Sequence, residues 1–239
     1  MVDEGHQDIG AATVRDADDL DRLHRRLSNV IGHALRTPAA TIRGQAEILA
    51  HTQDEDERRE TVEVLRRSAR RLEEMIDEVL VGEGLETRLP TGRTEDLDVA
   101  HEVRVVADDL EVVTEIEVAG DETVQVRAGR DALRWILRTV LDNAGRYGGQ
   151  GVVRAELSQH EGATRIRVSS PRGDIGMNDD DRRLGFEPFY RGERAVTVTG
   201  ARLGLGLTIA RRLATDLGGS VELENEDGGI VAVVELPCP

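Results

Sequence analysis

The residue with the clearest potential for chemistry is His33, in the stretch GHALRTP at residues 32–38. Neutral imidazole keeps a nitrogen lone pair near pH 7, so a positioned histidine can act as a nucleophile. His33 lies about 100° from a stripe of apolar residues spaced three and four apart, which places it on the flank of a helix. Taken alone, such a pattern more often marks a surface histidine on an amphipathic helix. The stripe consists of Leu20, Leu23, Leu27, Val30 and Ala34.

A second group of polar side chains falls on a helix that we expect from about Asp131 to Tyr147. Asn143 lies on nearly the same side as the apolar residues of this helix, where an amide is costly unless it has a partner. Arg146 and Tyr147 extend that side, three and four positions later. One side of the helix therefore presents an amide, a cation and an aromatic ring. The alternative is an ordinary amide that a backbone group satisfies.

A third candidate region is the irregular stretch 171–202, since loops of this length are usually lids, binding loops or disordered segments. Three of the five aromatic residues of the chain lie in FEPFYR, residues 186–191, which predicts an anchored lid. The stretch ends at LGLGL, residues 203–207, which opens a helix to about Leu217. Glycines at a helix N-terminus let backbone N–H groups approach an anion, although two glycines alone are a weak signal.

The elements that must position His33 form a helical hairpin. One helix is expected from about Asp16 to His51, bent or loosened near Pro38, and a second from the polar break at residues 52–56 to about Leu80. Both carry apolar residues at heptad spacing, which one hairpin alone covers poorly. We therefore expect a homodimer with a four-helix bundle. The alternative is a hairpin that packs on its own C-terminal domain.

The remaining chain reads as an α+β domain with a mixed, largely antiparallel sheet and helices on one face. Helices are expected at about 99–110, 131–147 and 203–217, and strands at about 112–118, 123–126, 152–157, 164–169, 220–224 and 230–236. The expected organisation is a leader or linker stub at residues 1–15, the hairpin at 16–82, a linker at 83–94 and the second domain at 95–239.

The charge of the chain excludes some functions. Its 239 residues carry a net charge of −16, and all 31 of its basic residues are arginine, so nonspecific nucleic-acid binding and docking on anionic membranes are disfavoured. No apolar run is long enough for a membrane span, and without a basic and apolar leader we expect no signal peptide. The single cysteine, Cys238, fits a reducing compartment and a cytoplasmic location. An acidic, lysine-free chain also fits the cytoplasm of a halophilic archaeon, although a GC-rich genome would favour arginine too.

Together, four motifs resemble those of a two-component sensor histidine kinase, in the family's order, over roughly residues 16–237. GHALRTP resembles the H box, LDNAGRY at 141–147 the N box, FEPFYR the F box, and LGLGLTI at 203–209 the later glycine box. The resemblance implies a dimerisation and phosphoacceptor hairpin followed by a Bergerat-type ATP-binding domain, an α/β sandwich with a mixed sheet.

The resemblance also implies roles for residues. ATP would phosphorylate His33, and the phosphoryl group would pass to an aspartate on the receiver domain of a response regulator. Thr37 would position water for phosphatase action. Asn143 would coordinate Mg²⁺ through its amide oxygen, a hard ligand, and arginines would neutralise phosphate charge. The residues expected to bind the nucleotide are Asn143, Arg146, Tyr147, Asp174, Gly176, Phe186, Arg191, Gly204, Leu205 and Gly206.

The chain departs from the family pattern at three places. Ala34 follows the phosphoacceptor where the family usually has an acid that helps to deprotonate the histidine. In the earlier glycine box, the adenine-reading aspartate is replaced by Ser170 when counted from the preceding strand, or by Arg172 when counted from the F box. Asp174, with Gly176, keeps half of that motif and is our preferred candidate. Arg202 replaces the first glycine of the later box.

These departures keep two other functions open. A degraded kinase could bind ATP poorly and act as a response-regulator phosphatase, and a non-catalytic dimeric scaffold could carry a vestigial nucleotide domain. A scaffold can lose its adenine contact, whereas a kinase must replace it. Related ATPases of the chaperone or mismatch-repair kind are disfavoured, because they lack an upstream H-box hairpin.

Overall fold

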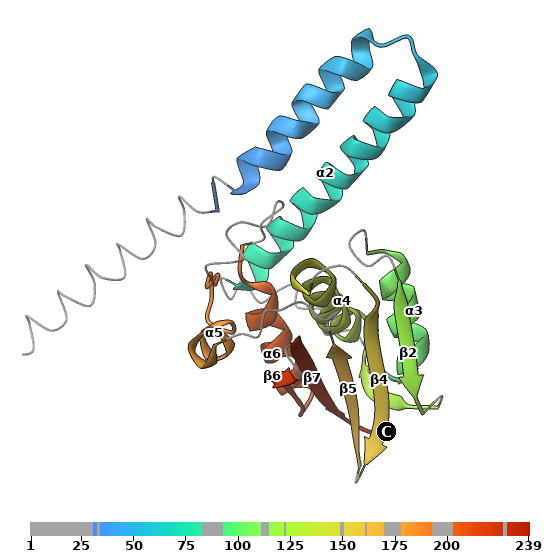
Figure 1. Cartoon of the computed structure of the whole chain (residues 1–239), viewed down its shortest axis with the longest axis vertical. Coiled ribbons are helices and arrows are strands. Elements are labelled where there is room, and N and C mark those ends of the chain that lie inside the picture. The colour runs from blue at the N-terminus through green and yellow to red at the C-terminus, as the bar shows by residue number, and fades with distance from the viewer. Residues whose placement is uncertain are drawn as a thin grey trace, which may run out of the picture. The chain divides into compact units, whose positions relative to one another are not determined.

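The computed structural model describes residues 31–32, 34–82, 93–110, 115–121, 123–148, 151–160, 162–169, 178–192, 203–226 and 229–239 (Figure 1). The chain divides into two compact units, Met1–Ile76 and Asp77–Pro239. His33 and the expected start of the first helix near Asp16 lie outside the described residues.

The first unit contains the helical hairpin that the heptad pattern predicts (Figure 1). One helix covers residues 34–51 and includes Pro38, and α2 spans Glu55–Gly82. Asp54 caps α2, because its Oδ1 accepts the backbone N–H groups of Asp56 and Glu57 at 2.9 and 3.0 Å. The polar break predicted at residues 52–56 is therefore a turn followed by a capped helix start.

The apolar residues at heptad spacing on the two hairpin helices form a seam, and this seam is incompletely covered within one chain. The seam residues Ile42, Leu49 and Leu72 are only half-buried. Ile76, also a seam residue, exposes 43% of its surface. A heptad seam in this state is typical of helices that pack against a further pair of helices. Among the described residues, no helix is long and apolar enough to span a bilayer.

In the described part of the second unit, five strands form a sheet in the order β2-β4-β5-β7-β6. The pair β2 and β4 is parallel and the other pairs are antiparallel, so the predicted mixed, largely antiparallel sheet is confirmed. These strands are β2 (Ile116–Gly120), β4 (Val153–His160), β5 (Ala163–Ser169), β6 (Ser220–Glu226) and β7 (Gly229–Pro237).

A separate two-stranded sheet pairs β1 (Thr94–Asp98) with β3 (Gln125–Gly129) in antiparallel fashion. The sequence analysis missed β1, and its first residue lies in the predicted linker. The reason is composition: Leu97 is the only buried residue of TEDLD, so the strand shows no apolar alternation.

Three helices pack on the large sheet: α3 (Val99–Asp108), α4 (Arg130–Tyr147) and α6 (Gly206–Asp216). Strands β4 and β5 bury alternate residues, such as Val153 and Ile166, as expected when one face is covered. The core consists mainly of Leu, Val, Ile and Ala, as the scarcity of aromatic residues predicts. A short helix, α5 (Asp179–Leu184), lies within the stretch that we expected to be irregular.

The opposite face of the sheet carries cross-strand ion pairs. Arg154 on β4 contacts Glu117 on β2 at 2.8 Å, and Arg167 on β5 contacts Glu226 on β6 at 2.7 Å. Arg165 lies 3.4 Å from Glu235. Individually such exposed pairs contribute little to stability. The first and third pairs join neighbouring strands, whereas Arg167 reaches across β7 to Glu226.

A buried carboxylate joins α3 to α4. Glu102, which exposes 1% of its side chain, accepts hydrogen bonds from Arg130 and from Arg134 Nε, the latter at 2.6 Å. Arg130 also contacts Glu95 at 3.1 Å, and this hydrogen bond raises the pKa of Arg130 above its ordinary value. Both arginines are themselves partly exposed, so only the carboxylate is removed from water.

Candidate active site

Helix α4 positions Asn143 near its C-terminal end. Apolar residues including Leu133, Ile136 and Leu141 are fully buried and fix the rotation of the helix on the sheet. Asn143 is half-buried, and the residues that the structure describes offer its amide no hydrogen-bond partner. The alternative of an amide satisfied by a backbone group therefore gains no support from these residues. A partly buried amide without a partner can receive a ligand with little rearrangement.

Arg146 is held by a residue that the sequence analysis did not single out. Asp142 accepts Nε of Arg146 at 3.1 Å and Nη2 at 2.9 Å, in a bidentate pair with side chains only 4% and 16% exposed. The Asp–Arg spacing of four on a helix could have indicated this contact. The pair fixes the guanidinium plane and leaves its other N–H groups available for an anion. Tyr147, the last residue of α4, is half-buried beside it.

The glycine turn, residues 203–206, contacts both α4 and the aromatic segment, residues 186–192. Leu203 and Leu205 are both 1% exposed and anchor the turn in the core, so Leu205 can reach a ligand only through its backbone. Gly204 has a φ of +81°, and a Cβ there would lie 2.7 Å from the carbonyl oxygen of Tyr190. A Cβ on Gly206 would lie 3.3 Å from Cγ2 of Thr139 on α4.

Gly206 begins α6, and no side chain caps this helix end. The first N–H groups of a helix have no intrahelical acceptor, so an uncapped start can bind an anion. Through the contact of Gly206 with Thr139, this start lies against α4, the helix that carries Asn143 one turn later. The structure thus places the glycine turn and the polar side of α4 in one region.

The aromatic segment, residues 186–192, is fastened to α6 and to the glycine turn. Thr208 Oγ1 donates to the carbonyl oxygen of Phe186 at 2.9 Å, and the N–H of Phe189 donates to the carbonyl oxygen of Gly204 at 3.0 Å. Phe189 adopts a φ of +64°, an uncommon conformation for a residue with a side chain. These bonds confirm that the segment is anchored.

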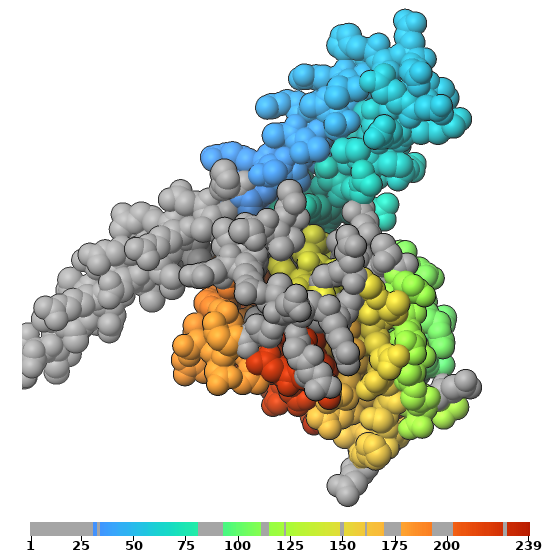
Figure 2. All heavy atoms as spheres, in the orientation of Figure 1, coloured from blue at the N-terminus to red at the C-terminus, as the bar shows by residue number. Residues whose placement is uncertain are grey.

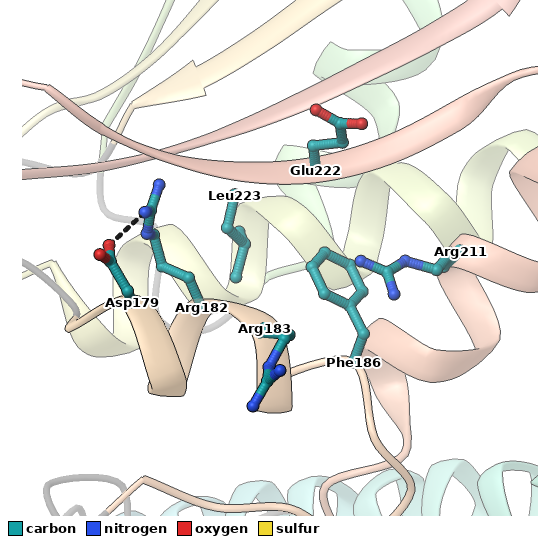
Figure 3. A pocket seen from close by; sticks show the side chains of 7 residues that line it. All are labelled: Asp179, Arg182, Arg183, Phe186, Arg211, Glu222 and Leu223. Carbon is teal, nitrogen blue, oxygen red and sulfur yellow. Dashed lines mark hydrogen bonds and ion pairs between the residues drawn. The ribbon is translucent and has the colours of Figure 1, made fainter.

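The Phe186 ring points into a hollow of about 240 Å³ between α5, α6 and β6 (Figure 3). Phe186 is 5% exposed, and the guanidinium carbon of Arg211 lies 3.4 Å from the centroid of its ring. Burial lowers the pKa of Arg211, while Glu222 and Glu187 act in the opposite direction. What the structure shows for Phe186 is therefore a packing contact, and its direct contact with nucleotide stays a prediction.

The remaining site predictions are only partly placed. Thr37 is exposed on the helix of residues 34–51, and its carbonyl oxygen accepts Thr41 Oγ1 at 3.1 Å. Arg191 is half-buried at the end of the aromatic segment. His33, Asp174 and Gly176 lie outside the described residues, as do the alternatives Ser170, Arg172 and Arg202.

The short helix α5 was missed although its sequence carries a signal. Asn178 caps the helix, three acidic residues form its first turn, and two arginines form its last turn. Such a charge order complements the helix dipole. The many glycines and charges around it dominated the sequence pattern and hid these six residues.

Comparison with known proteins agrees with this geometry. Residues 23–81 match the His Kinase A (phospho-acceptor) domain family, and residues 128–239 match the histidine kinase-, DNA gyrase B-, and HSP90-like ATPase family. The chain belongs to the sensor histidine kinases. The ATPase match covers the α4 site, the aromatic segment and the glycine turn, so the candidate site lies within the region that matches this ATPase family.

Curated relatives match most of the length of this chain. Sensor histidine kinase AruS of Pseudomonas aeruginosa is 29% identical over 222 residues, covering 89% of this chain and 22% of AruS. The chain spans about a quarter of the length of the curated relatives that it matches first.

Solved structures share the fold. Full-length ShkA in complex with AMPPNP is 26% identical with a TM-score of 0.60, covering 89% of this chain and 45% of ShkA. ThkA in complex with the response regulator protein TrrA is 18% identical with a TM-score of 0.61, covering all of this chain and 69% of the other.

Proposed function

We propose that the chain transfers the γ-phosphoryl group of ATP to His33 and then to an aspartate on the receiver domain of a response regulator. The observation that carries the proposal is the half-buried Asn143 amide, which has no partner among the described residues. It lies on the helix that holds Arg146 and packs against the glycine turn. Domain matches to a phosphoacceptor family and to an ATPase family support it.

Asn143 is the proposed protein ligand for Mg²⁺. Its amide oxygen is a hard donor, and Mg²⁺ commonly binds one or two protein oxygens together with phosphate and water. In the described part of the chain, no group of three or more histidines, cysteines and acids could hold a metal. The residues therefore fit an ion shared with the nucleotide, which when bound would neutralise phosphate charge.

Each remaining residue has a defined part in the transfer. Arg146, oriented by Asp142, and the N–H groups at the start of α6 hold phosphate oxygens. A ring nitrogen of His33 donates its lone pair to the γ-phosphorus, ADP leaves with the electrons of the broken bond, and the second ring nitrogen loses its proton. Ala34 cannot accept that proton, so we expect solvent to take it and the reaction to be slower than in kinases with an acid at this position.

The partners of the kinase follow from the hairpin. The uncovered apolar seam supports a homodimer with a four-helix bundle. The fold shared with ThkA, solved in complex with TrrA, supports a receiver-domain partner, and Thr37 would position water when the phosphorylated partner is hydrolysed. A cytoplasmic location is part of the proposal. The degraded-kinase and scaffold alternatives are not favoured by the comparisons.

Labelling with γ-labelled ATP and Mg²⁺ tests the proposed reaction. We expect acid-labile, base-stable label on the wild type and none on His33→Gln. His51→Gln is the control, since His51 is an exposed histidine at the end of the helix of residues 34–51 and should label like the wild type. A folded, dimeric wild type without label at any salt concentration would contradict the kinase proposal and favour the scaffold.

A halophilic origin is also part of the proposal, and it predicts a stabilising effect of salt. Raising KCl from about 0.1 M to about 1 M shortens the Debye length from about 10 Å to about 3 Å, so repulsion within a chain of net charge −16 is screened. The midpoint of thermal unfolding should therefore rise with KCl. Full stability without salt, measured by circular dichroism, would contradict the halophilic origin.

A further inference from the structure

Three consecutive aspartates begin α5, and the third, Asp181, contacts the aromatic segment. Asp179 pairs with Arg182 and Asp180 with Arg183, both within the helix. Asp181 makes no ion pair among the described residues. Its carboxylate is instead held by Asn178, whose Nδ2 donates to Asp181 Oδ2 at 2.9 Å. The same Asn178 accepts the backbone N–H of Asp181 at 2.6 Å, so the carboxylate is fixed in direction.

The other oxygen of Asp181 reaches the end of the aromatic segment. Oδ1 accepts a hydrogen bond from the hydroxyl group of Tyr190. A Cβ added at Gly192 would lie 3.4 Å from the same oxygen, so the backbone of Gly192 packs closely on this carboxylate. Asp181 therefore contacts the residues on both sides of Arg191.

The backbone around Tyr190 packs against the glycine turn. Its carbonyl oxygen occupies the space that a Cβ on Gly204 would need, and the neighbouring Phe189 donates to the Gly204 carbonyl oxygen. Helix α5 and the aromatic segment lie at the molecular surface beside the C-terminal elements, drawn in orange and red in Figure 2. The Asp181 carboxylate thus contacts Tyr190, whose backbone packs on the glycine turn before α6.

We propose that Asp181 is a positioning residue for nucleotide binding, which acts through the Tyr190 hydroxyl. Its carboxylate holds Tyr190 and Gly192 so that Arg191 between them, and the Gly204 backbone beneath, face the phosphates in one fixed arrangement. The contact is a charge-assisted hydrogen bond, the stronger class of such bonds. This inference rests on the proposed function, because it takes ATP as the ligand of the site.

Three variants test the inference: Asp181→Ala, Tyr190→Phe and the double variant. Tyr190→Phe removes one oxygen and keeps the ring, so it reports on the contact even if Asp181→Ala folds poorly. The matched control is Asp180→Asn, which removes an exposed charge one residue earlier. Binding of AMP-PNP with Mg²⁺ is measured by calorimetry, KM and kcat for ATP by autophosphorylation, and stability by thermal unfolding.

We expect each single variant to raise both Kd and KM by about tenfold, with kcat changed by less than about twofold. The double variant should bind no more weakly than Asp181→Ala, because both substitutions break one contact. Asp180→Asn should match the wild type. A lower unfolding midpoint with unchanged Kd would overturn the inference and assign a purely structural role, as would additive losses in the double variant.

The two proposals can fail separately. If the wild type binds AMP-PNP but never labels His33, the kinase proposal fails while the order of Kd values still decides the role of Asp181. If His33 is labelled and Tyr190→Phe leaves Kd and KM unchanged, only the role of Asp181 is overturned.

Discussion

Replacing Gly204 with alanine is expected to weaken ATP binding by roughly 30-fold or more. The backbone at Gly204 has a φ of +81°, and the new Cβ would lie 2.7 Å from the Tyr190 carbonyl oxygen and 3.2 Å from the Phe189 Cα. Both neighbours are backbone atoms, which cannot rotate away. Strain of about 2 kcal/mol in the bound arrangement would correspond to about 30-fold in Kd. Calorimetry with AMP-PNP measures the change.

The control variant Gly162→Ala distinguishes the steric clash at Gly204 from the strain of a positive φ alone. Gly162, in the turn between β4 and β5, has a φ of +85°, but nothing lies within 4 Å of its added Cβ. This control should lower the free energy of unfolding by about 1 kcal/mol and leave the Kd for AMP-PNP unchanged. Equal Kd values for Gly204→Ala and the wild type would contradict the assignment of the glycine turn to the site.

The second large effect concerns the stability of the ATP-binding domain. The double variant Arg130→Met/Arg134→Met should lose about 3–5 kcal/mol of unfolding free energy, because it leaves the Glu102 carboxylate buried without its cationic partners. Glu102→Leu should lose far less, within about 1 kcal/mol, since the arginines that it releases are already partly exposed and the site becomes apolar. Urea unfolding at neutral pH measures both values.

Arg138→Met serves as the control for this pair of variants. Arg138 joins α4 to Asp109 at 3.3 Å, and the Asp109 side chain is 65% exposed. Its loss should cost less than about 1 kcal/mol. Similar losses for the arginine double variant and for Glu102→Leu would contradict the view that desolvation of the carboxylate dominates.

Much of the fold could be predicted because it depends on periodicity. The heptad spacing predicted the hairpin, and the alternation around Ile166 and the apolar side of α4 predicted elements that the structure confirms within one residue. Strand β1 could not be predicted, since its single buried residue, Leu97, carries no period. Register and strand order depend on contacts between distant segments, which no local pattern contains.

The candidate site was predictable at positions where a residue type is unusual for its place. Asn143 on an apolar helix side and Gly204 before a helix are examples. Asp142 and Asp181 were missed because acidic residues are common in this chain and neither stands at an unusual place in the sequence pattern. Their meaning comes from the partner, Arg146 in one case and Tyr190 in the other, and only the second partner lies on another segment.

The hydrogen bond between Phe189 and Gly204 closes a chain loop at its base. Because the two ends are fixed there, each doubling of the sequence length between them adds about 0.6 kcal/mol of loop-closure cost. Insertions between Gly192 and Leu203, such as an epitope or a fluorophore-binding tag, should therefore be tolerated by the fold. A shift of either fixed end by one residue would instead place a side chain where the glycine must lie.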